Sequence, residues 1–419
     1  MSGILGTQAY KRYFNHPTSY TQGAITASMP LGSMAGSMVS SVLADNWSRK
    51  AALQISCVFW IVGSAIQCGS VNVAMLCVGR GVAGLCVGIA SSIVPIYQAE
   101  IAPKEIRGRV VSLQQWAITW GILIQYFVQY GAAHALGNGP DDPDQTTAAF
   151  RIPWAVQSVP AMILFVGLFF FPHSPRWLAT CDRWDECLVV LANLHGKGDM
   201  RHPRVLAQYR EIEDALREER RGTVGWKALM QRRILKRVVL GVSIQAWSQL
   251  CGMNIMMYYI MYIMEATKIA SPLLTASIQY IINMLLTLPA ILFLDKIGRR
   301  PALVGGSFAL MTLLFVSGAI QQYYGRPLDE ESKNRDHSSI SWSISEDHHD
   351  ASVAIVTCSY LFVAVFATTW GPTSWTYPAE IFPSTIRARA VSLSTAANWA
   401  CNAILAFLVP PMIWRIKYA

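Results

Sequence analysis

The sequence predicts an all-α membrane protein made of two pseudo-symmetric helical bundles. Hydrophobic residues make up 53% of the 419 residues and charged residues only 14%, a balance that a single soluble surface cannot cover. Two charged segments also occur twice: AEIAPKEIRGRVVSL at residues 99–113 returns as AEIFPSTIRARAVSL at 379–393, and DNWSRKAAL at 45–53 returns as DKIGRRPAL at 295–303. Two halves with matching charged hinges are typical of membrane transporters whose bundles rock about a central site.

Ten apolar segments account for the predicted helices, and most of them reach the roughly 20 residues that a spanning helix needs. Residues 1–7 are short, uncharged and followed by polar residues, so they do not resemble a cleaved signal peptide. Both ends look cut, and we expect about ten of the twelve helices of a longer parent, preceded by a stub. The predicted segments are residues 24–44, 51–68, 72–98, 110–133, 152–171, 238–262, 272–294, 301–323, 351–379 and 390–414.

Positive charge marks one side of the predicted protein. Lys and Arg gather in alternate connections, with fourteen of them between Pro172 and Arg237, whereas the other connections are short or acidic. By the positive-inside rule the basic connections face the cytoplasm. The formal net charge of +9 is therefore a topology signal, and we expect a lipid bilayer and no nucleic acid as a partner.

The polar residues 172–237 divide the chain into an N-terminal bundle, residues 1–171, and a C-terminal bundle, residues 238–419. Within this linker, YREIEDALREERRGT at 209–223 alternates acids and bases at helical spacing. We therefore expect one or two short amphipathic helices under the membrane, in a tether that carries no site.

The sequence offers no basis for enzyme chemistry. Seven of the nine cysteines lie in apolar segments and the other two, Cys181 and Cys187, in the linker, which provides neither a disulfide framework nor a metal-binding spacing. The apolar segments show no catalytic nucleophile and no catalytic carboxylate pair. We expect no enzymatic activity, no metal and no cofactor.

Each hinge carries an acid followed by bases, which can cross-link helix ends on the cytoplasmic face. Exposed pairs of this kind contribute only about 0 to 1 kcal/mol each, but several together can bias a two-state equilibrium. The bases could instead act only as topological anchors. Because the carboxylates recur in both halves and anchoring needs only bases, we favour a gating latch. The pairs are Asp45 with Arg49 and Lys50, Glu100 with Arg107, Asp295 with Arg299 and Arg300, and Glu380 with Arg387.

Arg80 differs from these residues because it lies several positions inside a predicted span. A charge there costs about 2.5 kcal/mol or more unless it is paired or wetted, so we expect Arg80 to face the cavity. The sequence shows no obvious intramembrane carboxylate for it. We hypothesise that a natural first helix supplies this acid, and that its protonation couples the protein to a proton gradient.

Amide side chains gather at mid-membrane depth. In segment 238–262, Gln245, Ser248 and Gln249 lie near one stripe, with Asn254 about a turn and a half beyond. Amides both donate and accept, and indoles stack on apolar sugar faces, so the set suits a neutral polyhydroxylated ligand. Any one of these amides could instead bond only a neighbouring helix. The other members are Gln115, Asn283, Asn398, Asn402 and, at a helix break that we assign to Pro372 and Pro378, Trp375.

Taken in chain order, several motifs resemble the sugar porter family of the major facilitator superfamily, and most of all its fungal high-affinity hexose transporters. They are GRGVAG, PIYQAEIAPKEIRGR, PHSPRWL, SQLCGMN, LDKIGRR and WGPTSWTYPAEIFPSTIRAR. The resemblance implies the major facilitator fold and a monomer in the plasma membrane. It also implies alternating access for a monosaccharide, glucose or another hexose, with proton symport.

The resemblance also implies roles for particular residues. The hinge charges, together with Arg176 of PHSPR, match the cytoplasmic gate of the family. The residues that match its sugar contacts by position are Gln115, Gln249, Asn254, Asn283, Trp375 and Asn398, with Gln245 on the same helix.

Three residues depart from the family pattern. His173 stands where the motif PESPR has glutamate, and Ser48 replaces a glycine before the hinge arginine, so the latch is expected to be weaker. Ser248 replaces the first of two paired glutamines, which leaves the exact sugar open. Three other interpretations also remain open: a transport-like sugar receptor, a uniporter that works by facilitated diffusion, and a truncated gene model without activity.

Overall fold

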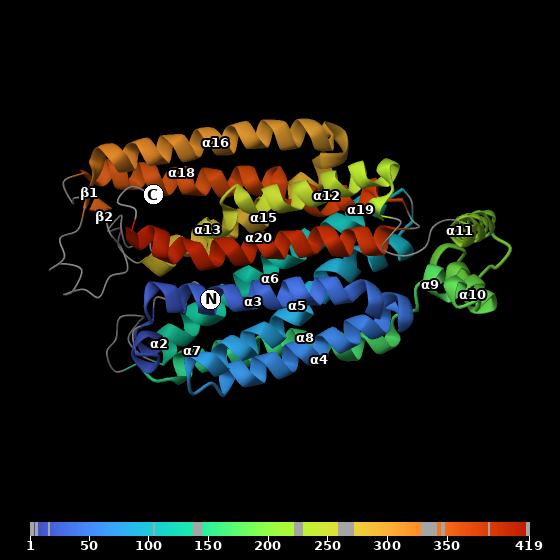
Figure 1. Cartoon of the computed structure of the whole chain (residues 1–419), viewed down its shortest axis with the longest axis horizontal. Helices are drawn as coiled ribbons and strands as arrows, with labels where there is room; N and C mark the ends of the chain where they lie inside the picture. The colour runs from blue at the N-terminus through green and yellow to red at the C-terminus, as the bar shows by residue number, and fades with distance from the viewer. Residues whose placement is uncertain are drawn as a thin grey trace.

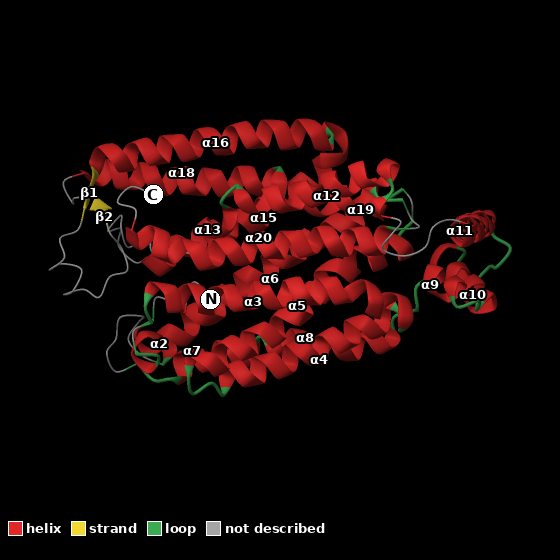
Figure 2. Cartoon of the chain, viewed as in Figure 1, coloured by secondary structure: helices red, strands yellow, loops and turns green. Residues whose placement is uncertain are grey.

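The computed structural model is almost entirely helical in the residues that it describes (Figure 2). Long helices run side by side in two groups, one formed by the first half of the chain and the other by the second half (Figure 1). The described residues are 4, 7–15, 17–103, 105–136, 145–221, 229–258, 272–327, 342–344, 348–383 and 386–415.

The first bundle consists of α2 (Gln8–Tyr13), α3 (Ser19–Asn46), α4 (Arg49–Cys68), α5 (Val73–Ile101), α6 (Arg107–Ala135), α7 (Ala148–Val156), α8 (Ser158–Gly167) and the 3₁₀ turn η1 (Leu168–Phe170). Short polar side chains set three of the helix starts. Thr18, Ser48 and Asn72 cap α3, α4 and α5, because the side-chain oxygen of each accepts the backbone N–H three residues later. Ser48 adopts a left-handed φ of +104°, and Gly298, its counterpart in the repeated hinge, has a φ of +87°. The two hinges therefore turn in the same way.

The linker forms α9 (Pro175–Thr180), α10 (Trp184–His195) and α11 (Pro203–Arg221), which lie beyond one end of the bundles, where α9 contacts the first bundle (Figure 1). We call the end of the molecule beside these helices the linker face. The sequence predicted one or two helices here, and that count was wrong. The additional helix, α9, starts shortly after the last span of the first bundle. Ser174 caps it, and Pro175 suits its first turn. The three helices share a small core that includes Trp177, Cys187 and Leu191.

The second bundle consists of α12 (Arg232–Leu250), α13 (Met253–Tyr258), α15 (Pro272–Ile297), α16 (Arg299–Tyr324), the strand pair β1 (Gly325–Pro327) and β2 (Trp342–Ile344), α18 (His349–Thr368), α19 (Trp370–Ile381) and α20 (Arg387–Arg415). The break between α18 and α19 falls at Thr369, not at the two prolines that we had assigned to it. Pro372 lies in the first turn of α19, where the missing N–H costs nothing. Trp375 therefore lies within a helix and not at a break.

Eight helical spans within the described residues are long and apolar enough to cross a membrane. The sequence predicted ten, and the two others are α3 and α6, whose 28 and 29 residues are long enough but more polar. Both helices pack against helices of the other bundle. Polar residues at these helix contacts are not exposed to lipid, so such a helix can span with fewer apolar residues.

Small residues let α3 approach both bundles closely. A Cβ added to Gly84 or Gly88 of α5 would overlap the backbone carbonyls of Met29 or Ser33 on α3. On its other side α3 meets α20, where a Cβ on Gly23 would lie 2.6 Å from the Phe407 carbonyl oxygen. Helix backbones in direct contact are typical of membrane bundles, in which packing replaces the hydrophobic effect.

Replacing Gly88 by Ala tests this packing. The added methyl group has no space against α3, so the variant should lose about 1–3 kcal/mol of stability or more, measured as a lower unfolding temperature in detergent. Gly121→Ala on α6 is the matched control, since its Cβ meets nothing within 4 Å, and it should leave the unfolding temperature unchanged or slightly raised. Equal effects of the two substitutions would contradict the close approach of α3 and α5.

Candidate functional site

Two sets of amide side chains lie one helical turn apart on α12. In the first set, Asn398 of α20 donates from Nδ2 to Oε1 of Gln245 at 2.5 Å and approaches Oγ of Ser248 at 3.4 Å. Gln245 in turn donates from Nε2 to the carbonyl of Ser374 on α19 at 2.9 Å. All four residues are buried. This set joins α12, α19 and α20 inside the second bundle.

The second set is centred on Gln249. Its Oε1 accepts hydrogen bonds from Nδ2 of Asn254 and, at 3.3 Å, from Nδ2 of Asn402. Gly252, with a φ of +93°, separates α12 from α13 and allows Asn254 to turn back toward α12. The sequence analysis noted Asn402 only as one further amide. Its spacing of four residues from Asn398, the same as between the two glutamines of α12, is the signal that places it in the site.

Three buried amide oxygens of this bundle have no hydrogen-bond partner among the described residues. They are Oδ1 of Asn283, Oδ1 of Asn402 and Oε1 of Gln279. An acceptor buried without a partner costs about 1–3 kcal/mol. Hydroxyl groups are suitable donors for it. The interior of the second bundle is therefore suited to a ligand rich in hydroxyl groups.

The first bundle reaches this region through α6. Nε2 of Gln115 lies 3.6 Å from the position that a Cβ on Gly371 of α19 would occupy. Trp375 follows Gly371 by four residues, so it lies on the same face of α19, and it is half-buried. Among the predicted contacts, hydrogen bonds link Gln245 with Asn398 and Gln249 with Asn254, while Gln115, Asn283 and Trp375 lie on adjoining helices.

Arg80 is buried between α5 and α3. Its Nε donates to the carbonyl of Ile25 at 2.8 Å, and its Nη2 lies 4.0 Å from Sδ of Met29. Pro30, which lacks an N–H, interrupts the hydrogen bonding of α3 one turn later. The guanidinium group is thus stabilised in part by a backbone carbonyl, and its pairing with an acid from a preceding helix stays a prediction.

Glu100 is the centre of the charge cluster at the linker face. Its carboxylate contacts the Arg49 guanidinium at 3.2 Å and accepts a hydrogen bond from Oγ of Ser174 at 2.5 Å. The Arg49 and Glu100 side chains are only 6% and 8% exposed. Because Arg49 begins α4 and Ser174 caps α9, Glu100 ties two helices of the first bundle to the linker.

Among the described residues, an ion pair between the bundles uses a residue that the sequence analysis did not include in the latch. Arg389 of α20 lies 3.7 Å from the carboxylate of Asp45 on α3. Within the second bundle, Arg299 donates to Oε1 of Glu380 at 2.8 Å, a more exposed pair. Arg387 donates to the carbonyl of Phe382 at 3.4 Å. Arg389 shares its hinge with Arg387, and only the packing of α3 against α20 shows which acid it meets.

The sequence predicted four further gating residues. The side chains of Arg107 and Asp295 lie outside the described part of the structure, so their pairings stay predictions. Arg300 is exposed at the start of α16, and Arg176 is half-buried on α9. Across the residues that the structure describes, no group of acids, histidines and cysteines could hold a metal ion.

His173 lies at the linker face and stacks on Trp177, with 5.3 Å between the ring centroids. Burial, followed by the positive charges of Lys50 and Arg183, lowers the pKa of this histidine below its ordinary value of 6.5. It is therefore neutral at neutral pH and cannot act as the carboxylate that the resembling motif has at this position. Negative charge beside Arg49 is supplied by Glu100 and Asp45 instead.

A small cavity of about 260 Å³ lies where the bundles meet near the linker face, lined by residues of both hinges, among them Ala99, Gly108, Glu380 and Arg387. A larger groove of about 1040 Å³ runs between α12 and α16, with mostly apolar side chains and Trp370 along it. The groove does not include the amide sets, so the chemistry for a polar ligand lies elsewhere.

Comparison with known proteins connects these features to one family. The family model described as "Sugar (and other) transporter" matches residues 3–419. The chain belongs to this transporter family. Its members transport their substrates, which agrees with the prediction that the chain is not an enzyme.

Two curated relatives and one solved structure show how far this similarity extends. The MFS glucose transporter mfs1 of Aspergillus flavus is 58% identical over 100% of this chain and 79% of its own length. The high-affinity glucose transporter of Kluyveromyces lactis is 40% identical over 100% of this chain and 74% of its own length. The proton:xylose symporter XylE from E. coli superimposes with a TM-score of 0.79, at 26% identity, over 98% of this chain and 84% of its own. The chain is thus a multi-pass sugar transporter with the major facilitator fold, as the sequence predicted.

The hinge pairs of the two bundles should differ in strength. Replacing Glu100 by Gln removes the buried partner of Arg49 and leaves it only the more exposed Asp45 at 3.6 Å. Breaking a buried pair costs up to about 3–5 kcal/mol, so the unfolding temperature should fall strongly. The equivalent Glu380→Gln breaks an exposed pair worth about 0–1 kcal/mol and should change that temperature little. Equal losses in the two variants would show that the two pairs contribute equally to stability, contrary to this prediction.

Proposed function

We propose that this sugar transporter carries a hexose, glucose first among them, across the plasma membrane by alternating access. The observation that carries the proposal is the pair of amide sets on α12 with unpaired acceptors on α15 and α20. Curated relatives named as glucose transporters support the choice of sugar. The proposal needs no cofactor and treats the chain as a monomer in the bilayer.

The bundle interior can bind a hexose without any charged group. Gln249 keeps its Nε2 to donate while its Oε1 accepts two hydrogen bonds, and the acceptors of Asn283 and Asn402 can take hydroxyl protons. Gln115 adds an amide from the other bundle, so closure of the two bundles around a sugar would complete the site. The indole of Trp375 offers a surface for the apolar face of the ring.

The charges at the linker face would then hold the cytoplasmic side closed while sugar enters from outside. Asp45 and Arg389 form an ion pair between the bundles, and its length of 3.7 Å and partial exposure make it weak enough to open. The buried pair of Arg49 and Glu100 lies within one bundle and moves with it. A weak ion pair between the bundles suits a gate that must open and close in each transport cycle.

Substitutions at Gln249 and Asn254 test the sugar site. Gln249→Ala or Asn254→Ala should raise the KM for glucose uptake about tenfold, with normal amounts of protein at the cell surface, because each loses one hydroxyl partner worth about 1–3 kcal/mol. Asn193→Ala, at an exposed amide of the linker, is the matched control and should change nothing. Unchanged kinetics in both site variants would contradict the proposed site.

We further propose that transport is coupled to protons. Arg80 is a buried cation whose charge can respond to an acid that gains and loses a proton, and the solved structure of a proton symporter has the same fold. Arg80→Gln should abolish accumulation while leaving exchange of sugar across the membrane.

Uptake by energised cells with and without a protonophore provides the measurement. Accumulation above the external concentration that collapses with the gradient, together with external alkalinisation on adding glucose, is the expected result. Equilibration without any pH change would indicate facilitated diffusion. Binding without uptake would indicate a receptor, and neither binding nor uptake an inactive chain.

A further inference from the structure

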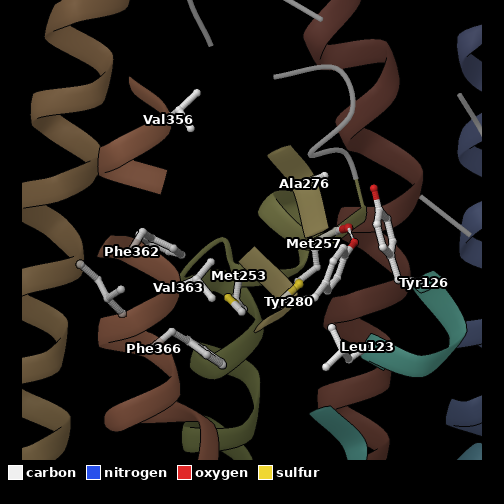
Figure 3. Packing of buried hydrophobic residues seen from close by; sticks show 11 residues of the cluster. Leu123, Tyr126, Met253, Met257, Ala276, Tyr280, Val356, Phe362, Val363 and Phe366 are labelled. Atoms are coloured by element: carbon white, nitrogen blue, oxygen red, sulfur yellow. Dashed lines mark hydrogen bonds between the residues drawn. The ribbon is translucent and has the colours of Figure 1, made fainter. Parts of the chain in front are cut away.

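Gln279 is an amide that neither the sequence motifs nor the amide sets of α12 account for. It lies on α15, is fully buried, and donates from Nε2 to the carbonyl of Met256 at 3.2 Å. The next residue, Tyr280, donates its hydroxyl to the carbonyl of Met257 at 3.0 Å, a contact visible in Figure 3. Two consecutive residues of α15 therefore hold two consecutive carbonyls of α13.

The helix that they hold, α13, is described over Met253–Tyr258. It follows the left-handed turn at Gly252 and carries Asn254, the partner of Gln249. The two hydrogen bonds from α15, together with packing against α18 and α20, therefore help to fix where Asn254 lies.

The other end of the Gln279 amide, Oε1, has no hydrogen-bond partner within the described residues. Only an N–H can donate to a carbonyl, so the contact with Met256 fixes the amide with Oε1 pointing away from α13. This oxygen is buried, and no residue in the described ranges gives it a hydrogen bond. Asn283 lies four residues later on the same face, about 6 Å away, and its Oδ1 is unpaired in the same way.

We propose that Gln279 is a further sugar-binding residue, which accepts a hydroxyl of the sugar at Oε1 while Nε2 holds α13. This inference rests on the proposed function of the same bundle interior. One amide would then bond the sugar and α13 at once, so the occupied site and the position of α13 are coupled. A sugar hydroxyl that bonds Oε1 also polarises the amide and strengthens its bond to Met256.

The test compares hydroxyl groups one at a time. Binding of glucose and of its 1-, 2-, 3- and 6-deoxy derivatives to the purified chain is measured by tryptophan fluorescence. In the unaltered chain, the analogue that lacks the hydroxyl facing Gln279 should bind about tenfold more weakly than glucose. In Gln279→Met, which has similar volume and no hydrogen bonds, glucose should bind as weakly as that analogue, with the other ratios unchanged.

Two further variants separate binding from packing. Gln279→Glu keeps one donor and one acceptor when its buried acid is protonated, so it should retain the discrimination. Gln67→Met removes an equally buried amide that bonds carbonyls within the first bundle, and it should alter no ratio. If Gln279→Met leaves every ratio as in the unaltered chain, whatever its effect on yield, Gln279 is a packing residue and the inference fails. If the unaltered chain binds no glucose, the proposed function itself fails.

Discussion

The close approach of α3 to helices on both of its sides is the contact on which the two-bundle arrangement depends. Glycine and serine on one side let it contact α5 backbone to backbone, and serines on the other side bond α20, where Ser392 donates to the Ser37 carbonyl. A larger residue on the face toward α20 would push the bundles apart, and one on the face toward α5 would separate two helices of the first bundle. The same small residues make α3 more polar than the eight spans that meet the length and hydropathy criteria, although the sequence predicted a helix at 24–44.

Helix backbones inside a membrane already satisfy their own hydrogen bonds, so the buried side-chain amides can bond one another or a ligand. Those of α12 and α20 bond one another in two sets and still leave acceptors unused on neighbouring helices. A core designed only for stability would fill this volume with leucine. Arg80 follows the same logic in the first bundle, since it bonds the backbone of a helix interrupted by Pro30 and remains a charge in a place where charge is costly.

Much of the fold could be predicted because it is written in local patterns: apolar segments of spanning length, two repeated hinges and alternating charge in the linker. The stripe of Gln245 and Gln249 was predictable for the same reason, since helical spacing places them together. Contacts between helices could not be predicted in this way. Asp45 pairs with Arg49 of its own hinge, as helical spacing suggests, but its second partner, Arg389, depends on how α3 and α20 meet. The break between α18 and α19 at Thr369 was not predicted either. Nothing local marks Gln279 either, whose donor end is fixed by a carbonyl more than twenty residues earlier in the chain.

The hinge at Ser48 has a consequence for how such proteins diverge. A positive φ with an extended ψ, here 104° and 156°, is a conformation that glycine adopts almost alone and that costs another residue about 1–3 kcal/mol, while the serine cap on α4 contributes about 1 kcal/mol. The cap offsets part of this cost, so a serine whose side chain accepts the Ala51 N–H can stand where the second repeat keeps Gly298. Evolution can thus replace the flexible glycine by a capping serine without changing the path of the backbone. A search that demands glycine at this position would overlook hinges of the same shape.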